Sequence, residues 1–245
     1  MRLNQYVLLS MFLLATNVFA ASAHESLIRS IKDGHAILQL GYYRGTQGER
    51  QHINIQDLIG DTFTVTQHHD NNALIGLGYF LDGNTLDRFK MSYGINGFYL
   101  GQTTVTGNVI QEDLFTNLSY HYNLTNMPIY LVARSIVDVH SPTFAVVLDA
   151  GIGPNFMKAY QFREQSLDGI TIQDDPFTSN TTTTVSGTLG ISIRMKQLFV
   201  SMPLECGYRF FYLGQGHFNT NNNQIINKLK TGQTYANAVT CAVSL

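Results

Sequence analysis

The sequence predicts an all-β fold, an eight-stranded antiparallel up-and-down transmembrane β-barrel with long extracellular loops. Three observations lead to this prediction: few charged residues, repeated alternation of apolar and polar residues, and connections that are alternately short and long. Only 13% of the 245 residues are charged, against about 25% in soluble domains, while the apolar share of 44% is ordinary. With 15 basic and 17 acidic residues, the chain lacks the positive excess that nucleic-acid binding requires. The composition also disfavours disorder and an ordinary water-covered enzyme.

The N-terminus has the pattern of a secretory signal peptide, which we place at residues 1–23. Arg2 precedes the short apolar run Tyr6–Ala15, and small residues allow cleavage after Ala20 or after Ala23. The alternative is an uncleaved membrane anchor, but the apolar run is short for that role. Beyond Ala23 no run approaches the ~18–20 apolar residues of a spanning helix. We therefore expect export, and a barrel domain over residues 24–245.

The rest of the chain alternates with a period of two, which indicates strands with one apolar face. In the segment 86–99, for example, Phe89, Met91, Tyr93 and Ile95 share one face. Tyr and Phe stand near many strand ends, as an interfacial girdle requires. The predicted strands cover approximately 35–43, 73–81, 86–99, 113–122, 144–153, 185–195, 200–210 and 235–245.

The connections determine how many of the runs span the membrane. Residues 82–84 and 196–197 form short turns, whereas Gly45–Asn71, Gly101–Gln111, Pro154–Thr183 and Gly214–Gln233 are long and polar. Bacterial barrels have an even number of strands, with all long loops on one side. A ninth run, Ile129–Val137, breaks that order, so we predict that it does not span. We place it in a periplasmic connector, Asn123–Pro142, with a short helix or a strand extension.

The polar face of the strands holds isolated charges that we expect to point into the barrel. These are Lys90, Asp149, Arg194, Glu205 and Arg209. A lipid-facing Arg or Lys at mid-depth costs roughly 2–4 kcal/mol, and buried charges must pair. We therefore predict an interior network centred on Asp149, Glu205 and Arg209, with Lys90 nearer the periplasm. A structural plug is the favoured interpretation; a gated pore or proton path is the alternative.

Two cysteines remain after export, Cys206 and Cys241, both on the outward face of the last two strands. A hairpin that pairs Leu213 with Thr234 places them opposite each other. Since the periplasm is oxidising, a disulfide can form. The alternative is two small lipid-facing residues.

Gln67-His68-His69-Asp70 is the only local histidine cluster. Adjacent side chains on an extended segment point opposite ways, so we predict neither a metal site nor a cofactor.

Two motifs resemble a known family. DAGIGPNF (Asp149–Phe156) is similar to the GAGVGY strand of small outer-membrane barrels, and LECGYRFFYLGQG (Leu204–Gly216) to their penultimate strand. The chain therefore resembles the bacterial eight-stranded OmpA/OmpX-like superfamily, without a periplasmic domain. It departs from that pattern at its end, Val243-Ser244-Leu245, where an aromatic residue is usual.

The resemblance implies location in the outer membrane, contact with the lipid bilayer and lipopolysaccharide, and insertion by the barrel-insertion machinery. We expect a structural, envelope-integrity or surface-interaction role, with a host or surface ligand bound by the loops and no nucleic acid. The alternative is a small pore or a hydrophobic-ligand transporter. An enzyme acting on lipid A is disfavoured, because no predicted strand has the His-x-Ser spacing of the deacylases; His24-Glu25-Ser26 lies at the cleavage site.

Overall fold

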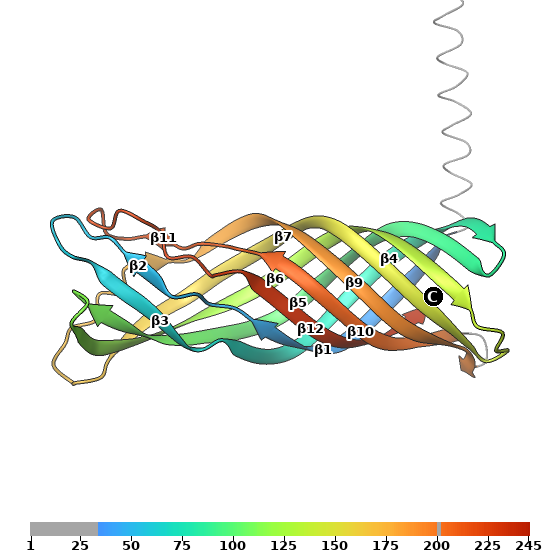
Figure 1. Cartoon of the computed structure of the whole chain (residues 1–245), viewed down its shortest axis with the longest axis horizontal. Helices are drawn as coiled ribbons and strands as arrows, with labels where there is room; N and C mark the ends of the chain where they lie inside the picture. Colours follow the sequence, from blue (N-terminus) through green and yellow to red (C-terminus); the bar gives the residue numbers. More distant parts are fainter. Residues whose placement is uncertain (1–33, 200–201) are drawn as a thin grey trace, which may run out of the picture.

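The computed structural model describes residues 34–199 and 202–245, and these form a tilted, closed barrel (Figure 1). The predicted signal peptide, 1–23, lies outside the described residues. The described residues contain no helix long and apolar enough to cross a membrane. The ring consists of β1 (His35–Thr46), β4 (His69–Leu86), β5 (Phe89–Gln111), β6 (Phe115–Asp138), β7 (Phe144–Ser166), β9 (Asn180–Phe199), β10 (Met202–Gly214) and β12 (Thr234–Ser244).

Every neighbouring pair in this ring is antiparallel, and β12 pairs with β1 to close it. This arrangement confirms the predicted all-β barrel of eight strands. Short turns and the C-terminus lie at one end, which is the periplasmic end in barrels of this kind. Four further strands belong to the connections at the other end: β2 (Gln51–Ile53), β3 (Asp61–Gln67), β8 (Phe177–Thr178) and β11 (Asn219–Thr220).

The outer wall near the periplasmic end carries a belt of exposed apolar side chains. Phe89 and Tyr99 limit this belt on β5, and Phe144 and Phe156 limit it on β7. Ten residues of a strand tilted by about 45° rise about 24 Å, which matches the hydrocarbon core of an outer membrane. Between the aromatic limits, Leu131, Ile152 and other large apolar side chains are exposed. The belt is therefore the membrane-spanning part of the barrel.

The strands continue far beyond the belt, and there the polarity of the wall reverses. On β6 the exposed Ile129 and Leu131 lie in the belt, whereas Leu118, Tyr120 and Tyr122 farther along are buried inside the barrel. On β5 a bulge between Leu100 and Thr103 lies where the strand leaves the belt. Beyond this bulge Val105 and Val109 point inward. Apolar groups must face lipid in the belt but must avoid water above it. This extracellular extension is thus built like a soluble barrel.

Because the strands continue beyond the membrane belt, three predictions about their positions are wrong. Ile129–Val137 does span: it pairs with β5 and β7 in the belt and belongs to β6, so Asn123–Pro142 is not a periplasmic connector. The run 113–122 belongs to the extracellular part of the same 24-residue strand, so the two runs form one strand and not a strand and a connector. The segment Gly101–Gln111 is strand rather than loop, and a turn at 112–114 joins it to β6. The other long connections contain the ends of β4, β7 and β9 as well as the four short strands.

The reversal predicts that an outward-facing arginine is costly at one height on β7 and tolerated at another. Ile152→Arg places a charge in the belt and should lower the free energy of unfolding by about 2–4 kcal/mol. Gln165→Arg, on the exposed outer face of the extension, should change it by less than about 0.5 kcal/mol. Guanidinium unfolding of both variants in lipid vesicles measures the difference. Equal destabilisation would contradict the assignment of the belt.

Candidate functional site

The lumen inside the belt is filled by a buried charge network. Arg209 donates both terminal nitrogens to the two oxygens of Asp149, at 2.6 and 2.8 Å. Glu205 accepts one hydrogen bond from Arg194 Nε at 2.5 Å and another from Arg134. Glu205 is only 4% exposed, so its two cationic partners offset a large cost of desolvation.

The structure brings together four of the five predicted charges. The fifth, Lys90, lies at the periplasmic rim and pairs instead with Asp82 at 2.6 Å, where both side chains are exposed to water. Arg134 was missed because its run, 129–137, was excluded from the barrel. Arg134 is the single charge in the alternating sequence IYLVARSIV, and this was the available signal that the run has an inward-facing charge. Gly190 makes room for the network, because a Cβ there would lie 2.8 Å from both carboxylate oxygens of Asp149.

Further layers close the lumen above the charges. Tyr130 and Ser186 share a hydrogen bond at 2.6 Å, and Asn155 donates to Asn126 at 2.8 Å. The cavity beside the charge network holds about 20 Å³, enough for about one water molecule. Above these layers the extension contains a cluster of aromatic rings in contact: Phe63, Tyr120, Tyr122, Phe162, Phe177 and Phe218. The described interior is therefore a packed core.

The last hairpin of the barrel is crosslinked. Cys206 on β10 and Cys241 on β12 are opposite in the register, face outward and form a disulfide. Toward the extracellular end, a bulge between Tyr212 and Gly214 shifts this register, so that Thr234 pairs with Gly214 rather than with Leu213.

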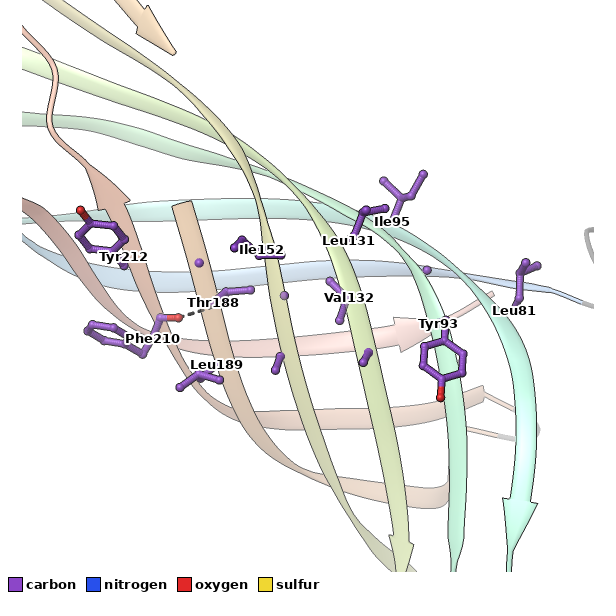
Figure 2. A pocket seen from close by; sticks show the side chains of 15 residues that line it. Leu81, Tyr93, Ile95, Leu131, Val132, Ile152, Thr188, Leu189, Phe210 and Tyr212 are labelled. Carbon is purple, nitrogen blue, oxygen red and sulfur yellow. Dashed lines mark hydrogen bonds between the residues drawn. The ribbon is translucent and has the colours of Figure 1, made fainter. Parts of the chain in front are cut away.

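A groove on the outer wall lies within the belt (Figure 2). Its floor is made by small outward-facing residues, Ala133, Ala150 and Gly187, and larger side chains such as Leu131 and Ile152 border it. The hydroxyl of Thr188 donates to the carbonyl of Phe210, so this polar atom is satisfied within the wall. The groove of about 860 Å³ is almost wholly apolar and faces the hydrocarbon, which suits it to acyl chains of the surrounding lipid.

The extracellular end contains a second kind of cavity, which we call the mouth cavity. It holds about 400 Å³, and all four extracellular connections contribute to its wall. Ile53 and Leu58 come from the β2–β3 hairpin, Phe115 from the β5–β6 hairpin, Pro176 from the β7–β9 connection and Ile225 from the last connection. The backbone bridge between Ile55 and Ile225 ties the first connection to the last.

Four carboxylates also line the mouth cavity: Asp61, Glu112, Glu164 and Asp174. Backbone N–H groups hold three of them, since Glu112 donates to Asp61, Ile59 donates to Glu112, and Asp174 donates to Glu164, at 3.1–3.2 Å. Among the described residues that line it, none is Lys, Arg or His. Sequence reasoning missed this cavity, because its residues come from segments far apart in the chain.

Glu164 has the most unusual environment of the four. Its side chain is only 8% exposed, and the described residues place no cation against it. Burial, together with the neighbouring carboxylates of Asp175 and Asp174, raises the pKa of Glu164 to about 7. Burial likewise raises the pKa of Asp61, against the opposing effect of the Glu112 N–H. The cavity thus concentrates negative charge on an apolar wall.

The buried ion pairs of Glu205 and the exposed ion pair of Lys90 should contribute differently to the free energy of unfolding. Glu205→Gln leaves Arg134 and Arg194 without their counter-charge inside the barrel and should lower the free energy of unfolding by about 3–5 kcal/mol. Lys90→Gln removes an exposed pair and should cost less than about 1 kcal/mol. Guanidinium unfolding in vesicles compares them. A Glu205→Gln variant as stable as Lys90→Gln would contradict the network.

Comparison with known proteins identifies the fold. No protein-family model and no curated protein sequence matches the chain. Among solved structures, the outer membrane protein OprG from Pseudomonas aeruginosa is 12% identical with a TM-score of 0.50, and the alignment covers 86% of this chain and 96% of OprG. The outer membrane protease OmpT from Escherichia coli is 9% identical with a TM-score of 0.50, with 88% of this chain and 96% of OmpT covered. At such identities the likeness concerns the fold, and the apolar belt independently shows the environment. The chain therefore has the fold of small outer-membrane β-barrels, with an apolar belt that suits a membrane.

Proposed function

We propose that this protein acts at the cell surface, with the membrane barrel as a closed support and the extracellular end as a binding surface. The observation that carries the proposal is the convergence of all four extracellular connections on one cavity above a filled lumen. Such connections, held by a rigid scaffold, are where binding residues concentrate. The expected partners are a host or surface ligand at this end, and lipopolysaccharide along the outer leaflet.

The packed interior favours this role over a pore. Ions that cross the belt would have to pass the Glu205 and Asp149 layers and then the aromatic cluster. A hydrophobic-ligand transporter would need a path from the groove on the wall to the lumen, and inward-facing side chains such as Val132 and Thr188 lie behind that groove.

The fold itself does not separate binding from catalysis, since OmpT is a protease with a similar fold. We propose a non-enzymatic role, because no group of three or more His, Cys, Asp or Glu side chains in the described residues is arranged to hold a metal ion. The carboxylates of the mouth cavity, in addition, stand beside apolar groups and lack a lining histidine.

A trimmed barrel tests the proposal. Residues 54–60 are replaced by the turn Asn-Gly, because Ile53 and Asp61 form the last pair of the β2–β3 hairpin. Residues 167–176, in the β7–β9 connection, are also replaced by Asn-Gly. A strain that lacks the gene should lose attachment to surfaces or capture of serum factors. The full chain should restore the lost property, and the trimmed chain should not, at equal abundance in the membrane.

The matched control is the full chain with Lys90→Gln, a change at the periplasmic rim, which should restore the property completely. Restoration by the trimmed chain would overturn the proposal and place the role in the membrane belt. Stepwise conductance of the full chain in planar bilayers would favour the pore instead.

A further inference from the structure

The buried carboxylate of Glu164, which has no cationic partner in the described part of the chain, leads to a more specific inference. A carboxylate that is 92% removed from water normally has a cationic partner, because desolvation penalises its charged form. Here the described neighbours supply only backbone N–H groups and more carboxylates, Asp174 and Asp175. The nearest arginine of this connection, Arg163, is exposed and donates to Asp175 at 3.2 Å. Glu164 therefore lacks a counter-charge among residues 34–199 and 202–245.

The shape of the mouth cavity indicates what could supply that charge. Its volume of about 400 Å³ is in the range of small-molecule sites, roughly 300–1,000 Å³. Phe63, Leu118 and Phe177 provide an apolar surface beside the carboxylates. A ligand that fits this surface must have an apolar body, and a ligand that satisfies the carboxylates must be a cation.

The other charged groups at the cavity favour a cation as well. Asp61 faces it from β3, Glu112 from the β5–β6 turn and Asp174 from the β7–β9 connection. His52, the titratable group close to this wall, shares a hydrogen bond with Thr62 at 3.0 Å and lies 4.0 Å from Asp113, outside the lining. The potential inside the cavity is therefore negative from several sides, which repels anions.

We propose that the mouth cavity binds a hydrophobic amine, a small molecule with one protonated amino group beside an apolar body, with Glu164 as the counter-charge. The proposal rests on the proposed surface-binding function and names the chemistry of one ligand. The ammonium group donates to the Glu164 carboxylate, and the apolar body lies against Phe63 and Phe177. Binding should release the proton of Glu164 to the solvent and leave an ammonium–carboxylate pair out of contact with water.

The test uses the full chain in nanodiscs of zwitterionic lipid and three matched probes: phenylbutylammonium, phenylbutanol and phenylbutyrate. Isothermal titration calorimetry, with empty nanodiscs as the reference for partition into lipid, should show the amine binding at least about tenfold more tightly than the alcohol, and no binding of the acid. Tenfold corresponds to about 1.4 kcal/mol. Equal affinities for the amine and the alcohol would overturn the proposal.

Glu164→Gln keeps the size of the side chain and should remove the preference for the amine while leaving the affinity for the alcohol unchanged. Glu49→Gln removes an exposed carboxylate of the same end that does not line the cavity, and should retain the preference. An undiminished preference in Glu164→Gln would overturn the proposal. The comparison of probes on the unmodified chain does not depend on whether a variant folds.

The pH dependence gives a further readout. The amine stays protonated over the whole range, whereas a carboxyl group with a pKa of about 7 becomes about thirtyfold more ionised between about pH 5.5 and about pH 8.5. Affinity for the amine should therefore rise with pH by up to about thirtyfold in the unmodified chain and stay nearly flat in Glu164→Gln. A flat profile in the unmodified chain would overturn the assignment of Glu164. Failure of these tests leaves the surface-binding function standing, because the trimmed barrel tests that function separately.

Discussion

The structure depends on one constraint: the same strands run from hydrocarbon into water. In the belt the outer wall must be apolar, so the polar groups of each strand lie inside, where they have to pair with one another. Above the belt the outer wall meets water, and the apolar residues of the same strands move to the inside. On β6 both conditions occur along a single alternation, with Ile129 facing lipid and Tyr122 inside the aromatic cluster. Two cores of opposite character are thus stacked in one barrel.

Each core closes the barrel in its own way. The lower core is closed by charge pairs, in which Glu205 joins Arg134 and Arg194, and by the hydrogen-bonded layer above them. The upper core is closed by rings, among them Tyr122 and Phe218, which meet edge to face at 5.0 Å. With the interior occupied over both parts, the space left for a ligand is at the extracellular tip. The long strands therefore serve to carry the hairpin tips away from the membrane.

Much of this architecture could be predicted from the sequence, because a period of two appears wherever one face of a strand meets an apolar environment. The eight-stranded barrel and an interior charge network that contains Asp149, Glu205 and Arg209 follow from that pattern. Alternation alone does not say on which side the apolar environment lies. The predicted strand 113–122 therefore has its apolar face toward lipid, whereas Leu118 and Tyr120 of that face are buried inside the barrel. The Gly, Thr and Asn residues of 101–111 are typical of a loop, yet Val105 and Val109 form part of the inner wall. The mouth cavity could not be predicted, since Glu164 and Phe63 meet only through the closure of the ring.

The disulfide has a consequence for the exposed end of the molecule. Cys206 and Cys241 are 35 positions apart in the sequence, and the last extracellular connection, between β10 and β12, lies between them. A surface protease that cuts this connection would separate the chain into two fragments, with β12 on the smaller one. The bond between Cys206 and Cys241 would still join those fragments, and β12 would keep its place beside β1 and β10. The barrel can therefore remain sealed after such a cut, and the cut would become visible only on a reducing gel.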